Sequence, residues 1–329
     1  MKAPGFWSRP PGLLSAALAP LGALYARATA RRVARGGTRL GVPVICVGNL
    51  TAGGTGKTPT AMWLAWRIDG AHVVSRGHGG RLEGPVRVNP ARHGADEVGD
   101  EALLLSAFAP VWVAKDRAAG GRAAEAAGAR AVILDDGFQN PALEKDLSIV
   151  VVDAGAGFGN NRVIPAGPLR EPVAAGMARA DLVLVVGEGD VGLPDGPAVL
   201  RGRLAPLRTG MDWKGLPVFA FAGIGRPEKF FATLRGLGCD IRGTEALADH
   251  QPLTPALLRR LGDRAARLSA QPVTTEKDAV RLPPALRGQV MVVPVRLEIA
   301  DPAPLEAALS GLGLLPTETG ARGRPSRSL

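Results

Sequence analysis

The chain contains little cysteine, and this scarcity excludes two kinds of site. Only Cys46 and Cys239 occur among 329 residues, and they stand far apart in the sequence. Two distant cysteines do not make a disulfide framework, and neither belongs to a Cys/His spacing that binds zinc. The cysteine content therefore fits a reducing cytoplasm.

Acidic residues are fewer than basic ones, and the excess of positive charge narrows the possible partners. The sequence has 40 Lys and Arg against 30 Asp and Glu, a net charge of +10. A basic protein favours nucleic acid, anionic lipid or phosphorylated substrates. RNP-type, zinc-finger and basic-zipper patterns are missing from the sequence, so we expect no nucleic acid partner. An anionic membrane surface and phosphorylated ligands remain as the possible partners.

The amino end lacks the order of charge that a signal peptide has. Residues 10–26 carry no charge and are interrupted by Pro20, and arginines follow them directly: Arg27, Arg31, Arg32, Arg35 and Arg39. In a signal peptide the positive charge precedes the apolar segment. An apolar helix with a basic flank predicts a helix on or partly in an anionic leaflet. The alternative is an amphipathic helix packed on the core.

What the chain does have is a phosphate-binding pattern after an apolar run. Residues 44–58 read VICVGNLTAGGTGKT, which is the order of strand, glycine-rich turn and helix in a P-loop. Backbone N–H groups of the turn can surround phosphate oxygens, Lys57 can reach the β- and γ-phosphates, and the Thr58 hydroxyl can hold Mg²⁺. We therefore expect ATP to bind residues Thr51, Ala52, Gly53, Gly54, Thr55, Gly56, Lys57 and Thr58.

Two positions of this loop differ from common P-loops. Thr51 stands where the usual pattern has its first glycine, although the run Gly53-Gly54-x-Gly56 keeps the loop rich in glycine. Ala52 stands where one class of P-loop ATPases has a second lysine that acts across a dimer. The alanine argues against a dimer-switched ATPase.

Short apolar runs alternate with helical segments through the first two thirds of the chain. This alternation predicts an α/β fold, a P-loop NTPase-like parallel sheet with helices on both faces. Ligands in such sheets bind at the carboxyl ends of the strands. The P-loop, the doublet Asp135-Asp136 and Asp153 all follow apolar runs, so we expect them at one edge of the sheet.

We predict four parts along the chain. Residues 1–35 form the membrane-associated helix with its basic flank, and residues 36–210 form the P-loop kinase domain. A smaller α/β domain follows at residues 211–316, where strand and helix patterns begin again near Trp213. Residues 317–329 are rich in Gly, Arg and Ser and are expected to be a disordered tail.

A P-loop kinase also needs an acidic side chain at the end of a second strand to hold Mg²⁺. Asp135 and Asp136 together are favoured over Asp153, because two adjacent carboxylates provide a ligand and a neighbour. Each of these residues alone is also compatible with a helix cap or a turn.

Transfer to an alcohol needs a group that accepts the hydroxyl proton, and His250 and Asp100 are the candidates. His72 lies in an apolar run and His93 in a polar loop, which favours structural or solvated roles for both. Residues 165–172 read PAGPLREP, a proline-framed loop that presents Arg170 beside Glu171. Such a loop fits either substrate binding or a structural turn.

These motifs together resemble one known family. GNLTAGGTGKTP, SRG-x-GG, VGDE, LDDGFQ-x-x-x-L-x-x-DL, DAG-x-GFGN, PAGPLREP, ADH and VTTEKD occur in the order found in tetraacyldisaccharide 4′-kinases, from about residue 5 to residue 297. The resemblance implies transfer of the γ-phosphate of ATP to the 4′-hydroxyl of an acylated glucosamine disaccharide 1-phosphate, giving lipid IV-A. It also implies work at the cytoplasmic face of the bacterial inner membrane, and we expect the protein to be a monomer.

The resemblance implies roles for individual residues as well. Lys57 and Thr58 would serve phosphate and Mg²⁺, with Asp135 and Asp136 near metal and phosphate. Asp100 and His250 resemble a proton-accepting pair in which Asp100 tunes His250. Arg170 and Glu171 would lie in the active site as substrate residues.

Three positions depart from the family's usual residues. The family usually has His, Tyr, and His or an aromatic residue where this chain has Asn140, His78 and Gln251. None of these positions carries a catalytic role assigned above.

Two other functions are weighed against the lipid kinase. A P-loop switch or chaperone would hydrolyse nucleotide without an acceptor, and a GTPase among them would need N/T-K-x-D; residues 275–278 read TEKD and do not match. A non-catalytic nucleotide-binding module on the membrane would have no turnover to lose. Neither alternative explains Asp100, His250 and the PAGPLREP loop together.

Overall fold

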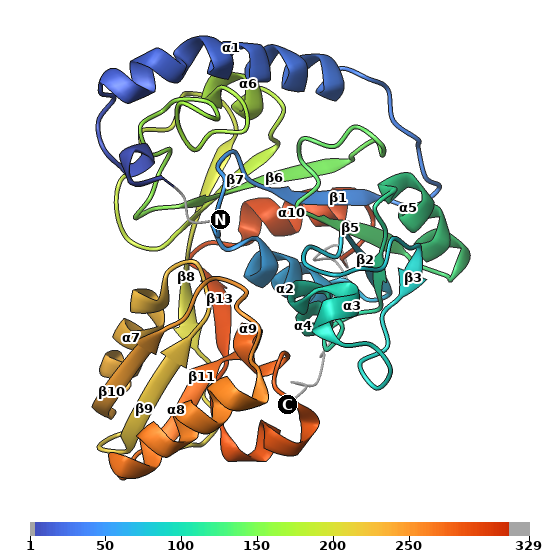
Figure 1. The fold of residues 1–329 in the computed structure, drawn as a ribbon. Coiled ribbons are helices and arrows are strands. Elements are labelled where there is room, and N and C mark those ends of the chain that lie inside the picture. Colours follow the sequence, from blue (N-terminus) through green and yellow to red (C-terminus); the bar gives the residue numbers. More distant parts are fainter. Residues whose placement is uncertain (1–3, 316–329) are drawn as a thin grey trace.

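The computed structural model describes residues 4–315, which contain two β-sheets (Figure 1). The larger sheet has nine strands in the order β13-β8-β7-β6-β1-β5-β2-β4-β3, and the smaller has four in the order β10-β9-β11-β12. The expected disordered tail lies outside the described residues.

The strands of the larger sheet are mostly parallel, with antiparallel pairs only at the two edges, β13 with β8 and β3 with β4. In chain order they are β1 (Val44–Gly48), β2 (Ala71–Ser75), β3 (Val86–Arg87), β4 (Val111–Val113), β5 (Ala131–Asp135), β6 (Leu147–Asp153), β7 (Leu182–Val186), β8 (Ala198–Pro206) and β13 (Val295–Ile299). The helices of this unit are α2 (Lys57–Arg67), α3 (Ala95–Val98), α4 (Asp100–Leu105), α5 (Arg117–Ala126), α6 (Val173–Met177) and α10 (Ala303–Gly311).

Both faces of the larger sheet are covered, which explains why its central strands read as unbroken apolar runs. Alternate residues of β1 enter opposite cores: Ile45 packs in one with α2, α4 and α10, and Cys46 packs in the other with α5 and α6. The predicted α/β fold with helices on both faces is confirmed.

The smaller unit repeats this arrangement on a reduced scale. Its strands are β9 (Pro217–Ala222), β10 (Asp240–Ala246), β11 (Gln271–Thr275) and β12 (Met291–Val293), and its helices are α7 (Pro227–Gly236), α8 (Pro255–Arg267), α9 (Glu276–Ala279) and the 3-10 helix η2 (Pro284–Gln289). Val218 packs with α7 on one face and Phe219 with α8 on the other.

The chain returns to the larger unit after the smaller one. β13 pairs with β8, and Leu305 and Leu309 of α10 are fully buried in the larger core. Residues 295–311 therefore pack with the nine-stranded sheet, whereas the sequence placed them with the smaller unit. The domain boundaries themselves stay a prediction.

A 3-10 helix, η1 (Gly5–Ser8), precedes α1 (Leu13–Val33), which lies across the outside of the larger unit (Figure 1). The residues that α1 buries are small or polar: Ser15, Gly22 and Thr29. Its large apolar side chains face outward, with Leu13 93% and Leu24 60% exposed. By length and composition α1 could cross a membrane, and within residues 4–315 it is the one helix that could.

Close packing at two points attaches α1 to the larger unit. The Ser15 hydroxyl donates to the Ala166 carbonyl oxygen at 3.0 Å. A Cβ at Gly22 would lie 2.9 Å from the Val163 carbonyl oxygen, so only glycine allows this approach. α1 therefore attaches through small residues and exposes large apolar side chains, which fits the predicted membrane-associated helix better than a core-packed amphipathic helix.

Candidate active site

The glycine-rich loop between β1 and α2 has the form of a phosphate cradle. β1 lies between β5 and β6 in the middle of the sheet, so the loop stands at the carboxyl edge. Gly56 has φ +101° and turns the backbone into α2, a conformation that other residues rarely adopt. Asn49 Nδ2 donates to the carbonyl oxygens of Thr51 and Gly53, which fixes the entry to the loop.

The loop fits a triphosphate by its unmet hydrogen bonding and its charge. The Thr55 hydroxyl is buried and has no hydrogen-bond partner among the described residues. A side chain at Gly53 or Gly54 would meet open space rather than protein, so the inside of the loop is accessible to a ligand. Lys57 begins α2, so its ammonium and the helix amino end share the site with the loop amides.

Asp136 joins the P-loop to the PAGPLREP loop. Arg170 contacts it with both guanidinium ends, Nη1 to Oδ1 at 2.7 Å and Nη2 to Oδ2 at 3.1 Å, and Lys57 Nζ lies 3.7 Å from Oδ1. Burial alone would raise the pKa of Asp136. The positive charges of Lys57 and Arg170 outweigh that effect and lower the pKa to about 2. Asp136 is therefore an anion at neutral pH.

Asp135 stands one residue earlier, at the end of β5, in a different electrostatic setting. It is 2% exposed, and burial together with the negative charges of Glu101 and Asp136 raises its pKa. The buried Arg117 donates to the backbone carbonyl oxygens of both aspartates at 3.0 and 2.9 Å. This contact holds the turn in which Asp136 has φ +54°.

The PAGPLREP loop lies directly against the P-loop. Ala52 N donates to the Pro168 carbonyl oxygen at 2.8 Å, and Arg170 N donates to the Leu50 carbonyl oxygen at 2.7 Å. These backbone bonds set the position from which the Arg170 side chain reaches Asp136. The two segments, more than a hundred residues apart in the chain, therefore form one structure.

The Glu171 side chain is buried beneath the contact between the PAGPLREP loop and the P-loop, so it is not exposed beside Arg170. Its two oxygens accept from Gln139 Nε2 at 2.9 Å and from Arg179 Nη2 at 2.5 Å. Gln139 Nε2 also donates to the Asn49 carbonyl oxygen at 2.9 Å. At 4% exposure, Glu171 is placed to support the loops.

Asp100 and His250 meet across the junction between the two units. His250 Nδ1 lies 2.9 Å from Asp100 Oδ2 and 3.1 Å from Oδ1. The hydrogen bond to Asp100 raises the pKa of His250, against the opposing effects of burial and of the Lys277 charge. Burial would raise the pKa of Asp100, but His250, Lys277 and Arg281 lower it.

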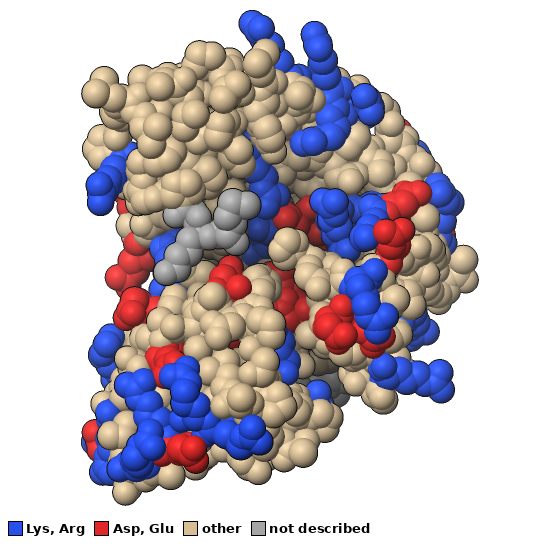
Figure 2. Space-filling view, in the orientation of Figure 1, with Lys and Arg blue, Asp and Glu red and all other residues tan. Residues whose placement is uncertain are grey.

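Ionic contacts extend from this pair toward the phosphate cradle. Lys277 of α9 lies 3.3 Å from His250 Nε2 and 3.1 Å from Glu101 Oε1. Glu101 in turn acts on Asp135 through its charge. Figure 2 shows charged side chains of both signs in the hollow between the two units. The predicted phosphate, metal and proton-accepting residues therefore come together at one junction.

Asp153, the other strand-end carboxylate, has different partners. Arg226 Nη2 lies 2.8 Å from its Oδ1, and Lys229 Nζ contacts its Oδ2. Both cations belong to the smaller unit, at or near the start of α7. Asp136 instead contacts Lys57 of the P-loop, so the Asp135-Asp136 doublet remains the candidate for the metal-binding carboxylates.

Three active-site residues had no role assigned from sequence. Arg117, Gln139 and Lys277 act through contacts between distant segments, which a single sequence does not reveal. A signal existed for two of them, because Gln139 and Lys277 belong to the motifs LDDGFQ and VTTEKD that follow strands. Arg117 follows a strand too, in the segment KDR.

The three departures from the family's usual residues have local explanations. The His78 ring meets the His250 ring edge-on, with centroids 5.6 Å apart. Asn140 Oδ1 accepts from Ala142 N and stabilises a turn. The Gln251 side chain accepts from Ala248 N and supports the loop that carries His250.

The donor set suits Mg²⁺ held jointly with phosphate. Within residues 4–315, no three His, Cys, Asp or Glu side chains gather as a metal site. A P-loop kinase needs no such group, because a Thr hydroxyl, a strand-end carboxylate and the phosphate oxygens share the ion. Thr58, Asp135 and Asp136 carry oxygen atoms that could take these positions.

The chain is similar in sequence to one known family of proteins. The profile of the LpxK family, tetraacyldisaccharide-1-P 4′-kinase, matches residues 14–313. A tetraacyldisaccharide 4′-kinase of Dinoroseobacter shibae is 63% identical, over 95% of this chain and 98% of the relative. One from Rhodospirillum rubrum is 52% identical, over 96% and 100% respectively.

A solved structure has the same fold. The "apo" form of LpxK from Aquifex aeolicus in complex with ATP aligns with a TM-score of 0.75 at 25% sequence identity. The alignment covers 91% of this chain and 99% of that one. With the profile match over residues 14–313, these likenesses establish that the chain belongs to the tetraacyldisaccharide-1-P 4′-kinase family.

Proposed function

We propose that this chain transfers the γ-phosphate of ATP to the 4′-hydroxyl of a tetraacyldisaccharide 1-phosphate, which forms lipid IV-A in lipid A biosynthesis. The observation that carries the proposal is the meeting of a P-loop with a His–Asp pair at one junction. Lys57 contacts Asp136 on one side, and His250 contacts Asp100 on the other. A nucleotide-binding module without chemistry has no need of the second pair.

The P-loop binds and orients the triphosphate. Loop amides of residues 51–58, the α2 amino end and Lys57 place positive charge around the β- and γ-phosphates. Thr58, Asp135 and Asp136 would hold Mg²⁺, which neutralises charge that develops on the phosphate oxygens. Arg170 keeps Asp136 ionised and in place through its two-point contact.

His250 accepts the proton of the acceptor hydroxyl. Its Nδ1 is directed at Asp100, so Nε2 is the atom that takes the proton. As the hydroxyl oxygen forms its bond to the γ-phosphorus, the bond from phosphorus to the β–γ bridging oxygen breaks and ADP leaves. Asp100 orients the imidazole and stabilises the imidazolium that results.

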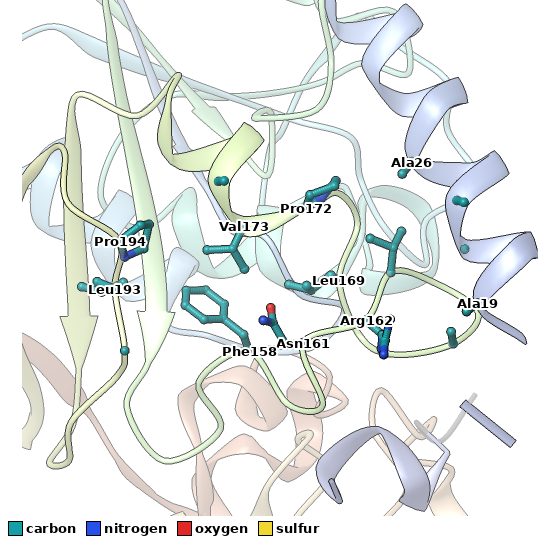
Figure 3. A pocket seen from close by; sticks show the side chains of 16 residues that line it. Ala19, Ala26, Phe158, Asn161, Arg162, Leu169, Pro172, Val173, Leu193 and Pro194 are labelled. Carbon is teal, nitrogen blue, oxygen red and sulfur yellow. The ribbon is translucent and has the colours of Figure 1, made fainter. Parts of the chain in front are cut away.

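The acyl chains of the substrate bind beside α1. A cavity of about 910 Å³ lies between α1 and the PAGPLREP loop, with mostly apolar walls (Figure 3). Ala19 and Ala26 line it from α1, and Leu169 and Pro172 line it from the loop. Leu169 immediately precedes Arg170, so one loop contacts both the cavity and the phosphate site.

The same helix holds the enzyme on the membrane as a monomer. The exposed leucines of α1 suit the acyl region, and the arginines after its uncharged segment suit anionic headgroups. Figure 2 shows an uncharged surface over most of α1 and basic side chains at one end of it. Because ATP is cytoplasmic, the enzyme works on the cytoplasmic face of the inner membrane.

A transfer assay tests the proposal. Wild-type protein receives γ-labelled ATP, Mg²⁺ and the tetraacyldisaccharide 1-phosphate in detergent micelles, beside a lipid-free control. We expect label in the lipid, and none with Lys57→Ala, because the γ-phosphate loses its cation. Release of free phosphate with or without lipid would indicate an NTPase instead, and nucleotide binding without either product would indicate a binding module.

A further inference from the structure

Lys277 occupies a position beside the proposed base that the reaction as described does not use. Its Nζ lies 3.3 Å from His250 Nε2 and 3.1 Å from Glu101 Oε1. The side chain is 23% exposed, so it is largely removed from solvent. Glu101 belongs to α4 of the larger unit, whereas Lys277 belongs to α9 of the smaller unit. The ammonium therefore stands at the junction, on the reacting side of the imidazole.

The neighbours of the imidazole select one tautomer. A lysine ammonium can only donate hydrogen bonds, and a carboxylate can only accept them. With Asp100 at Nδ1 and Lys277 at Nε2, the proton belongs on Nδ1 and the lone pair on Nε2. A proton on Nε2 would point at the N–H groups of Lys277. The contact thus favours the form of His250 that is ready to accept a proton.

Charges of both signs face His250. Asp100 contacts Nδ1, and Asp249 lies 3.7 Å from Nε2; both carboxylates favour the imidazolium. Lys277 is the cation in direct contact, and it disfavours the imidazolium. Further groups act on these neighbours or on the ring itself. Glu101 forms an ion pair with Lys277, Arg281 forms one with Asp100, and the His78 ring contacts the His250 ring. Without Lys277, the two carboxylates would favour the imidazolium, and the cation in direct contact that opposes them would be lost.

We propose that Lys277 is a positioning residue, which keeps Nε2 of His250 unprotonated until the acceptor hydroxyl replaces the ammonium there. Glu101 retains Lys277 when that hydrogen bond is exchanged, so the ammonium stays near without blocking the base. This inference rests on the proposed function, in which His250 is the proton acceptor. The inference adds that a neighbouring ammonium, which cannot itself accept a proton, favours the unprotonated form of the base.

The test measures the titration of His250 directly. The chain has four histidines, so their ring resonances are few, and His250→Gln identifies the one in question. We compare the wild type with Lys277→Gln, with Lys277→Arg, which keeps the charge, and with Glu101→Gln, which removes the same ion pair but leaves the ammonium. The substrate-free full chain is used in detergent.

We expect Lys277→Gln to move the His250 midpoint to higher pH. We expect transfer at pH 7 to fall about tenfold, because the fraction of unprotonated His250 falls by that factor when its pKa rises by about one unit. At higher pH the imidazole loses its proton again, so transfer should recover. Lys277→Arg and Glu101→Gln do not raise the midpoint. A midpoint that is unmoved or lowered in Lys277→Gln would overturn the inference, as would an equal rise in Glu101→Gln.

Failure of this inference differs from failure of the proposed function. If the midpoint does not rise in Lys277→Gln while transfer still depends on His250, the kinase stands and Lys277 has only a structural role. If transfer survives His250→Ala, the proposed base is wrong, and the Lys277 inference falls with it. If Lys277→Gln does not fold, the resonances of all histidines shift, and Lys277→Arg becomes the deciding variant. We expect the His250 midpoint and the transfer activity of Lys277→Arg to lie near the wild type. Loss of transfer in Lys277→Arg would overturn the inference.

Discussion

The Asp100 carboxylate is 3% exposed and lies 2.9 Å from His250 Nδ1, across the junction between the two units. This hydrogen bond raises the pKa of His250, whereas burial and the Lys277 charge lower it. As the proposed base, His250 must be unprotonated to act, so we expect activity to rise with pH through the pKa of His250. Because the net effect raises the pKa of His250, this acidic limb should lie at higher pH than that of an unperturbed histidine.

The substitution Asp100→Asn tests whether Asp100 raises the pKa of His250 and so sets the acidic limb of activity. The variant removes the negative charge that favours the imidazolium, so the pKa of His250 falls and the acidic limb of kcat/KM moves to lower pH. The amide also no longer stabilises the imidazolium, so transfer at the plateau falls by about 10²-fold. Lipid phosphorylation measured between pH 5 and 9 gives both quantities.

His250→Ala is the matched control for that variant. It should lower transfer by about 10²–10⁴-fold and abolish the acidic limb, because no imidazole remains to titrate. A loss below about tenfold would argue against His250 as the base. An unchanged limb in Asp100→Asn would show that the carboxylate does not act on the ring in solution.

Replacement of Arg170 is expected to weaken catalysis through Asp136. Its two hydrogen bonds to the carboxylate are charge-assisted, and such bonds contribute about 1.5–3 kcal/mol each. The two side chains are partly exposed, so solvent compensates part of this energy. Arg170→Met should therefore lower kcat/KM by about 10- to 100-fold, which corresponds to about 1.4–2.8 kcal/mol. Arg170→Lys keeps the charge but loses the two-point geometry, so we expect an intermediate loss.

The dependence on Mg²⁺ distinguishes this effect from a loss of folding. Arg170→Met frees the Asp136 carboxylate to move, so the Mg²⁺ concentration for half-maximal transfer should rise. Thermal unfolding of the variant, measured in parallel, should stay close to the wild type. Reduced activity with an unchanged Mg²⁺ requirement would place the role of Arg170 in substrate binding alone.

The fold of the larger unit was predictable because its signals are local. A strand buried on both faces must be apolar throughout, and β1, β5, β6 and β7 read in this way. β8 and β10 were not predicted, because most of their residues are exposed or half-buried and several carry charges. β13 was missed for a related reason: it pairs with β8, nearly ninety residues earlier, and no local pattern encodes such pairing.

The candidate site was predictable only in part. Lys57, Asp136, Asp100 and His250 stand in motifs, and the structure brings them to one junction. The partner of each carboxylate was not predictable, because Arg170 reaches Asp136 from another loop. Glu171 shows the limit most clearly: it was expected beside Arg170 as a substrate residue, yet its side chain is buried against Gln139 and Arg179.

Membrane binding should depend on the outward face of α1. Leu21 and Leu24 are 53% and 60% exposed, so the double change Leu21→Glu/Leu24→Glu should not disturb the core. It puts two charges into the surface that would contact acyl chains, and we expect the protein to move from the membrane fraction to the supernatant. Sedimentation with vesicles that contain anionic lipid measures this.

Two controls define that result. Leu21→Ala/Leu24→Ala removes bulk without adding charge and should leave more protein bound than the glutamate variant. Deletion of residues 1–30 should release the protein as well, although it also removes the Ser15 contact and one wall of the cavity. Retention of the glutamate variant and the truncated protein in the membrane fraction would show that α1 is not the anchor.

The ion-pair cluster around Asp153 should stabilise the junction between the two units. Asp153 is 5% exposed and contacts Arg226 and Lys229, which are 38% and 52% exposed. Solvent screens the two cations, so the contribution is modest. Arg226→Met/Lys229→Met should lower the free energy of unfolding by about 1 kcal/mol, as measured by urea denaturation.

A double-mutant cycle separates this interaction from other effects of the substitutions. Asp153→Asn, made in the wild type and in the Met/Met background, should cost more in the wild type, because only there does it break ion pairs. The backbone N–H groups of Gly155 and Ala156 hydrogen-bond to Asp153 in both backgrounds, so their effect cancels. Equal costs would mean that the cations do not hold Asp153 in solution, and the junction would then depend on its other contacts, among them Asp100–His250 and Glu101–Lys277.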